Sequence, residues 1–361
     1  MQAKQFIITV VPKNKLKRTE ENMGLDKKRI KDAFLLVLMI AAVFCYISCG
    51  SSSDDDDDDD DVNTALTVSG TAAKGLISGG VVSIHPIIDG VLSNTPIASS
   101  TTDANGDYSA TINNYDGNPF IVRVTTTATT TMRCDLPEGC GDGSAFGDDV
   151  TLNDSSFNLD AVVPPIPTTQ TNTSVNLSVL TTTASEVALN TLNSSPSTDI
   201  STLINNANTA VANRFGLTGN VTQLPVVDLT NPASLVGVAQ DVIQYNLLSV
   251  GVVETQLSGN NASTIAQALS NFATQFSTQG GIADTETAAS SNVTLTEILS
   301  AANQVADSVR NAISNAGGST ENLEQLQSTL NQAQQQAQNG STTPTGGTPD
   351  TGTGSSGGTI D

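Results

Sequence analysis

The stretch Val162–Thr171 reads VVPPIPTTQT and divides the chain into two parts with different patterns. Its three prolines lack a backbone N–H and fix φ, so the stretch cannot lie inside a helix or a central strand. Before it, short runs rich in Val, Ile and Thr predict strands; after it, apolar residues recur every three or four positions, as in helices. We therefore expect two independently folded domains and a linker, with boundaries at 62–163 for strands, 164–172 for the linker and 173–339 for helices.

The first domain has the pattern of short strands and turns that is typical of an all-β protein. Its runs of Val, Ile, Thr and aromatic residues are separated by turn pairs such as Asn105-Gly106 and Asp116-Gly117. About seven short strands in about 100 residues are typical of an Ig-like or prealbumin-like β-sandwich. The expected strands are 65–69, 81–86, 96–101, 108–112, 119–125 and 155–163.

Three segments of this domain resemble a known family. The segments VSGTA at 68–72, GVVSI at 80–84 and TDANGDYS at 102–109 together resemble the carboxypeptidase-regulatory-like domain. The resemblance implies a β-sandwich of the kind found in surface and periplasmic proteins. It implies no peptidase activity, because the domain does not hydrolyse peptides despite its name.

Two acidic segments could be mistaken for calcium sites. In the first, which begins at Asp103, an EF-hand loop would need Glu at its twelfth position, where Asn114 stands. In the second, Asp54–Asp61, eight consecutive carboxylates repel one another and are not spaced to converge on one ion. We predict a hairpin turn at the first, with calcium as the lesser alternative, and a solvated tether at the second.

The second domain reads as a bundle of five or six amphipathic helices. Asn231 followed by Pro232 and the pair Thr294/Glu297 are signals for helix starts, and Gly280 is a signal for a helix end. The outer faces carry Asn, Gln, Ser and Thr, so packing must supply the stability. The last, Gln-rich helix is expected to fray or to need a partner, and the tail at 340–361 is expected to be disordered. The expected helices are 177–189, 200–215, 232–248, 265–276, 294–313 and 323–337.

The N-terminus reads as a targeting segment. The basic run KKRIK at 27–31 precedes the apolar run 33–47 and then Ser48-Cys49, a pattern that resembles the lipobox of bacterial lipoproteins, with Tyr46 where that family prefers Leu. The resemblance implies a signal peptide at 1–48, which we expect to start at Met23, and a lipidated Cys49 followed by a tether at 49–61. Gly50 implies sorting to the outer membrane. The alternatives are a single-pass anchor and a plain signal peptide.

Cys134 and Cys140 enclose five residues with Pro137 and Gly139, which allow a tight reversal. After export the compartment is oxidising, which favours a disulfide between them. Free thiols, a metal site and a redox pair are the alternatives. The segment, like the helical half, resembles uncharacterised surface lipoproteins of marine-type bacteria.

The net charge and the motifs of the sequence reduce the number of function classes to consider. The net charge is −22, and nine of the 14 basic residues lie before residue 32, which excludes a nucleic-acid binder. His85 is the only histidine, neither a G-x-S-x-G elbow nor a phosphate loop is present, and we assign no catalytic residue, metal or cofactor. We predict a non-enzymatic envelope lipoprotein with a binding or structural role, facing the periplasm or the surface, whose partners are the membrane and envelope proteins or surface polymers. An accessory subunit docking through the helices is the alternative, and a secreted hydrolase the minor one.

Overall fold

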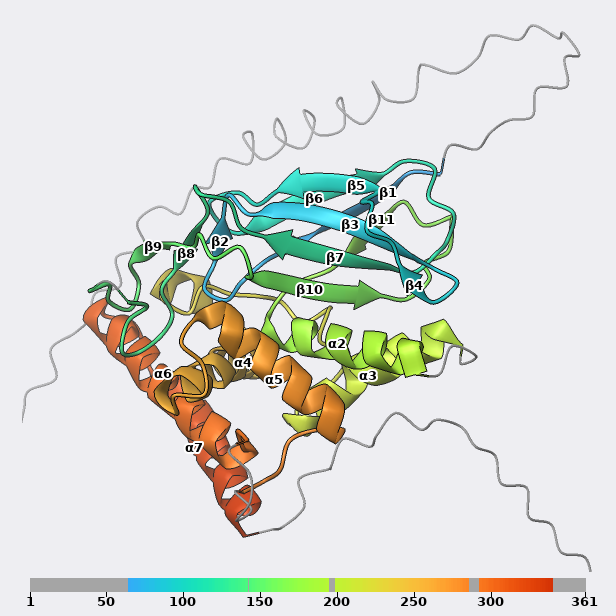
Figure 1. Ribbon diagram of the computed structural model, residues 1–361. Helices are drawn as coiled ribbons and strands as arrows, with labels where there is room; N and C mark the ends of the chain where they lie inside the picture. Colours follow the sequence, from blue (N-terminus) through green and yellow to red (C-terminus); the bar gives the residue numbers. More distant parts are fainter. Residues whose placement is uncertain (1–63, 142, 195–198, 286–291, 340–361) are drawn as a thin grey trace, which may run out of the picture. The chain divides into compact units, whose positions relative to one another are not determined.

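A computed structural model describes residues 64–141, 143–194, 199–285 and 292–339 (Figure 1). The predicted signal peptide, Cys49, the eight-Asp run and the tail at 340–361 lie outside these residues. All the described residues belong to one compact unit, which continues through the Pro-rich stretch. Its strands come first and its helices second, as the change of period predicts.

The strands form three sheets. The largest has the order β10-β7-β3, with β4 and β5 both paired to β3; the second has the order β11-β1-β6, and the third β2-β8-β9. The burial of β6 alternates strictly, so its polar residues face outward and its apolar residues join the core. The strand bounds are β1 Leu66–Thr71, β2 Ile77–Ser78, β3 Val81–Ile88, β4 Val91–Leu92, β5 Ala98–Thr101, β6 Asp107–Ile112, β7 Phe120–Thr125, β8 Thr131–Arg133, β9 Asp149–Thr151, β10 Asn158–Val163 and β11 Asn172–Ser174.

Six of these strands, β1, β3, β5, β6, β7 and β10, confirm the six that the sequence predicts, with ends shifted by a few residues. The other five have only two or three residues each. Such short elements contain too few positions to display a period of two, so their pairing is decided by the neighbouring strands rather than by their own sequence.

Six α-helices and one 3₁₀ helix follow in the described residues. Thr294 and Glu297 form the predicted capping box, and Gly280 ends a helix in the left-handed conformation, also as predicted. The bounds are α2 Val179–Ser194, α3 Ile200–Arg214, η1 Pro232–Leu235, α4 Gln240–Ser258, α5 Ile265–Gln279, α6 Leu295–Asn315 and α7 Glu321–Gln338.

The helix expected at 232–248 is wrong at both ends: no α-helix begins at 232, and α4 continues beyond 248 to Ser258. Asn231 does accept a hydrogen bond from the N–H of Ala233 at 3.1 Å, but the turn it starts is the 3₁₀ helix η1. Gly237 then adopts a φ of +74°, outside the helical range, and α4 begins only at Gln240. Because the helix is interrupted there, the apolar side chain of Val236 stands at the surface with 83% exposed.

The strands and helices are joined along the edge strand β10, beside which α2 lies (Figure 1). The N–H of Asp160 donates to Thr182 Oγ1 at 3.0 Å, and that of Val162 donates to Ser185 Oγ at 2.9 Å. These hydroxyls take the place of the neighbouring strand that an edge strand lacks. Thr182 and Ser185, poor helix formers inside α2, therefore have a structural use.

The Pro-rich stretch is also more than a spacer. Ile166, inside the predicted linker, is 7% exposed, and its N–H donates to the Tyr115 hydroxyl at 3.1 Å. Immediately afterwards β11 pairs in parallel with β1, so the chain returns to the sheet beyond the prolines. The contact between the two parts is more extensive than a linker between separate domains implies.

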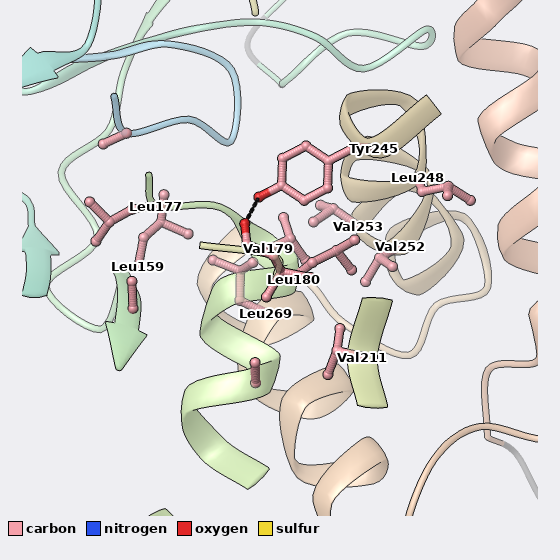
Figure 2. Packing of buried hydrophobic residues seen from close by; sticks show 14 of the residues in the cluster. Leu159, Leu177, Val179, Leu180, Val211, Tyr245, Leu248, Val252, Val253 and Leu269 are labelled. Carbon is pink, nitrogen blue, oxygen red and sulfur yellow. Dashed lines mark hydrogen bonds between the residues drawn. The ribbon is translucent and has the colours of Figure 1, made fainter. Parts of the chain in front are cut away.

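One apolar core runs from the sheets into the helices. Figure 2 shows the part where Leu159 of β10 and Leu180 of α2 approach α4. At its centre the Ser178 hydroxyl lies 2.6 Å from the Tyr245 hydroxyl, and Ser178 also accepts the N–H of Leu180 at 3.1 Å. Burial raises the pKa of Tyr245, which keeps the phenol neutral at this junction.

Candidate functional site

Every Lys and Arg after residue 61 lies in the described part of the chain, and each forms an ion pair with an aspartate. All five cations in these residues therefore already have a carboxylate partner, although the Nη1 atom of Arg214 is buried without a hydrogen bond. The pairs are Lys74–Asp135, Arg123–Asp160, Arg133–Asp149, Arg214–Asp284 and Arg310–Asp307.

Lys74 and Asp135 form the most deeply buried of these pairs. Lys74 is 2% exposed, Asp135 is 4% exposed, and the Lys74 ammonium donates to the Asp135 carboxylate. The turn that carries Lys74 contains Gly75, whose φ is +63° and whose Cα faces the carbonyl of Arg133 so closely that a side chain would not fit. The close packing of this turn therefore fixes the backbone position of Lys74.

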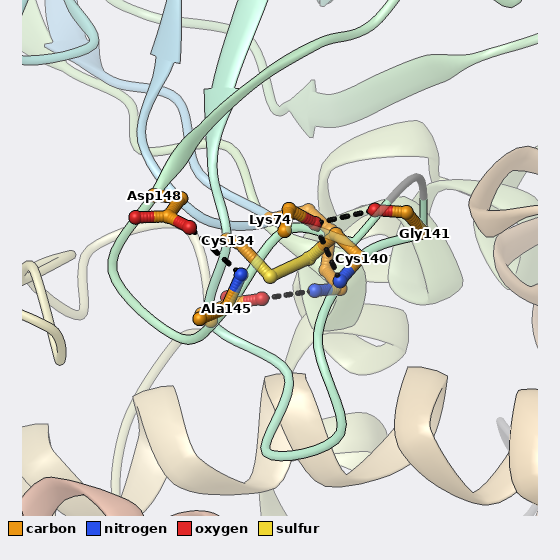
Figure 3. The surroundings of a disulfide bond; sticks show 8 residues. Lys74, Cys134, Cys140, Gly141, Ala145 and Asp148 are labelled. Atoms are coloured by element: carbon orange, nitrogen blue, oxygen red, sulfur yellow. Dashed lines mark hydrogen bonds and ion pairs between the residues drawn. A yellow bond between two sulfur atoms is a disulfide. The ribbon is translucent and has the colours of Figure 1, made fainter.

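The disulfide fixes the position of Asp135, the other partner of the pair. Cys134 and Cys140 are bonded, with 5.7 Å between their Cα atoms, and they close the loop that contains Asp135 (Figure 3). Next to the loop, the N–H of Cys140 donates to Ser144 Oγ at 3.1 Å. The disulfide thus holds Asp135, one partner of the buried ion pair, in place. This is a structural use of the two cysteines.

A small cavity of about 20 Å³ adjoins the ion pair. Ser178, Asn246 and Ser249 line it, and the Ser249 hydroxyl has no hydrogen-bond partner within the protein. A cavity of this size accommodates about one water molecule. Ser178, Lys74 and Tyr245 are side chains of the types used in nucleophilic catalysis. However, Ser178 is 2% exposed, and the cavity beside it is too small for a substrate.

Glu254 of α4 adds a further carboxylate to this region. It is 5% exposed, and burial raises its pKa; the charges of Glu138 and Asp135 raise it as well, while Lys74 lowers it. Several carboxylates therefore share one ammonium group, and the cluster is balanced more easily when Glu254 is protonated.

His85 and the predicted calcium alternative both lie elsewhere. His85 is half-buried inside β3, and its ring nitrogens lie 3.0 Å from Ser93 O and from Ser83 Oγ. Asp103 Oδ1 accepts the N–H groups of Asn105 and Asp107, so the carboxylate stabilises the turn before β6. Across the described ranges, no group of three or more His, Cys, Asp or Glu side chains is placed to hold a metal ion.

An open groove of about 450 Å³ lies where η1, α4, α6 and α7 meet. Ile243, Ile313 and Leu323 form its buried base, and Leu235 and Val236 belong to its rim. None of the lining residues carries a charge. The sequence prediction missed this groove because it continued the helix through Gly237; a glycine inside an apolar stripe was the signal against that helix.

A second open hollow, of about 380 Å³, follows the polar face of α5. Amide and hydroxyl side chains line it, among them Gln256, whose Oε1 is buried without a hydrogen-bond partner. Gln275 is fixed there, since it donates to Val293 O at 2.7 Å and accepts from Val293 N–H at 3.1 Å. This cleft, too, is uncharged along its lining.

The predicted lipidation site, Cys49, lies outside the described residues, so its surroundings are not part of this geometry. Among the helices that are described, none combines the length and the apolar character needed to span a bilayer.

Comparisons with known proteins give little. No family model matches the chain, and no curated protein matches it. Among solved structures, a 9R-lipoxygenase from Cyanothece PCC8801 is found at 10% identity and a TM-score of 0.18. The match covers 55% of this chain and 32% of the lipoxygenase chain, and a likeness this weak carries no argument about fold or activity.

Proposed function

We propose that the protein is a non-enzymatic lipoprotein of the bacterial cell envelope, anchored in the outer membrane through Cys49, with a binding role. The separation of charge from open space carries this proposal. Lys74 and Ser178 lie beside a cavity for one water molecule, whereas the two open hollows have uncharged linings. Catalysis needs reactive groups within hydrogen-bond reach of a substrate, but binding needs only an accessible complementary surface.

The envelope location is supported by the residues around the folded part. The lipobox-like Ser48-Cys49 and the Asp54–Asp61 tether suit a protein held at a distance from a membrane. The Cys134–Cys140 disulfide suits an oxidising compartment. For the strand region we propose the Ig-like, carboxypeptidase-regulatory-like sandwich that the 102–109 motif implies.

The anchor is tested by Cys49→Ser in the full chain, expressed in a bacterial host with a labelled fatty acid. We expect the variant to lose the label and to leave the membrane fraction. Cys45→Ser, four positions earlier in the apolar run, is the matched control and should stay labelled and membrane-bound. Retention of label by Cys49→Ser would contradict the lipoprotein assignment.

The minor alternative, a secreted hydrolase, is tested with a panel of ester, peptide and glycoside substrates. We expect no turnover above that of a heat-treated sample. Turnover that disappears in Ser178→Ala, while the fold is retained, would contradict the non-enzymatic assignment, because it would require the small cavity beside Ser178 to admit a substrate.

A second candidate function, an accessory subunit docking through the helices, is favoured by the surface of α7. Its exposed residues Gln332, Gln335 and Gln336 form an uncharged face, where most soluble helices carry Glu and Lys. If this face docks on an envelope protein, the variant with Gln332→Lys and Gln336→Lys should lose a partner that cross-links to the wild type. Unchanged cross-linking would argue against this face.

A further inference from the structure

We propose that the groove between η1, α4, α6 and α7 binds a small amphiphile whose polar head carries no negative charge, such as a monoacylglycerol. This proposal gives the binding role above a ligand class, and it rests on that role.

The size of the groove suits a small molecule. Its volume of about 450 Å³ falls within the range of about 300–1,000 Å³ that is typical of small-molecule sites. The cavity beside Lys74, by contrast, has only about 20 Å³. Within the described residues, the groove therefore combines room for a ligand with a mainly apolar lining.

The lining suits an apolar chain that ends in a polar head. Ile243, Ile313 and Leu323 form the base with 5%, 9% and 3% exposed, so the base is fixed by the core and cannot collapse freely. Ser319 and Asn322 are the polar side chains of the lining. Sites for small molecules typically combine such an apolar wall with a few polar groups that orient the ligand.

The wall formed by α4 and α7 is held together across the groove. The Gln240 side chain donates to the carbonyl of Asn322 at 3.4 Å and to Gln325 Oε1 at 3.2 Å. These contacts tie the start of α4 to the start of α7. A wall that is already in place reduces the entropy that the protein must lose when a ligand binds.

The lining of the groove disfavours an anionic head. None of the lining residues carries a charge, and Arg310, the cation of α6, is paired with Asp307 at 2.7 Å. A carboxylate that entered the groove would lose its water without gaining a cation, whereas a neutral glycerol head would not have to desolvate a charge.

The rim leaves apolar surface in water. Val236 is 83% exposed, the highest value among the large exposed apolar residues of the described chain. A ligand lying along the rim would cover this side chain, and removal of apolar surface from water is favourable.

The test uses the mature chain, residues 49–361, with Cys49→Ser, so that the result does not depend on the lipid anchor. The neutral apolar dye N-phenyl-1-naphthylamine reports occupancy by its fluorescence. Monolaurin, kept below its micelle concentration, should displace the dye saturably. Laurate has the same chain with a carboxylate head and should bind at least about tenfold more weakly.

The variant with Val236→Asp and Ala316→Asp places two charges on the groove lining and should weaken monolaurin binding by about tenfold or more. Val91→Asp with Ala104→Asp is the matched control, since Val91 is 69% exposed on β4 and Ala104 is exposed in a turn. The control should bind like the parent. Circular dichroism and thermal melts check that both variants fold.

Three results would overturn the proposal. The first is the absence of saturable dye displacement by monolaurin. The second is equal binding of laurate and monolaurin. The third is a dimer in sedimentation that dissociates in the Val236→Asp, Ala316→Asp variant, since a second copy of the chain would then cover the groove. None of these results would affect the lipidation assignment, which the Cys49→Ser labelling tests separately.

Discussion

The small cavity beside Lys74 and the larger groove beside Val236 differ in size and in lining. The cavity has about 20 Å³ and is bordered by an ammonium group, two carboxylates and hydroxyl groups, whereas the groove has about 450 Å³ and an uncharged, mainly apolar lining. The cavity lies where strands and helices meet, and the groove lies among helices alone. Reactive groups and accessible space are therefore separated in this protein: the charges hold the fold together, and the space is available for binding.

The largest expected effect comes from separating the two parts of the chain. Residues 62–163 alone lack β11 and the α2 hydroxyls that satisfy the edge of β10. We therefore expect this fragment not to fold cooperatively, although the sequence pattern predicts an independent domain. Circular dichroism during thermal unfolding measures it, with residues 62–339 as the control. A cooperative melt of the short fragment would show that the strand core is sufficient, and the cavity would then be a contact between domains.

Next in size is the loss of the buried ammonium group. Lys74→Met leaves the carboxylates of Asp135 and Glu254 buried without a cation, which should lower the free energy of unfolding by about 3–5 kcal/mol. Arg310→Met is the control, because its pair with Asp307 is partly exposed and such pairs contribute about 0–1 kcal/mol. Urea unfolding of both variants gives the comparison. Equal effects would mean that the cavity is open to water and is no different from the surface.

The disulfide should have a smaller effect. Replacement of both Cys134 and Cys140 by Ser releases the loop that carries Asp135, and the loop is short, so we expect a loss of about 2 kcal/mol, at the low end for disulfides. Urea unfolding measures the loss, and mass spectrometry of unreduced peptides establishes the bond in the parent. The groove is formed by other residues, so its dye binding should not change. Weaker dye binding would show that the two hollows are coupled.

The smallest effect has the opposite sign. Because the pKa of Glu254 is raised in the folded protein, its contribution to stability is fully present below the unfolded pKa and is lost as the pH rises through the folded pKa. At neutral pH the charged form is therefore unfavourable. Glu254→Gln should raise the melting temperature at pH 7, and the gain over wild type should shrink as the pH is lowered toward 4. A lower melting temperature at pH 7 would show that Glu254 is a favourable partner of Lys74.

The elements that the sequence predicts well are those with strong local signals. The capping box of Thr294 and Glu297, the left-handed Gly280 and the alternating strand β6 depend on residues within a few positions of one another. The prediction of a continuous helix from 232 failed because a single residue overrode the local signals. Asn231 and Pro232 start a helical turn correctly, but one glycine at 237 decides that the turn does not continue.

The order of strands and helices, the six longer strands and most of the helix ends follow from local sequence signals, because hydrophobic period and capping act over one or two turns of chain. Which groups share a site depends instead on how distant segments pack. Lys74 meets Asp135 across 61 positions, and Thr182 reaches the edge of β10 across 22, distances at which no local pattern operates. The groove has the same origin: η1, α4, α6 and α7 enclose it only after packing, since a hollow is a property of the surfaces that several elements leave uncovered.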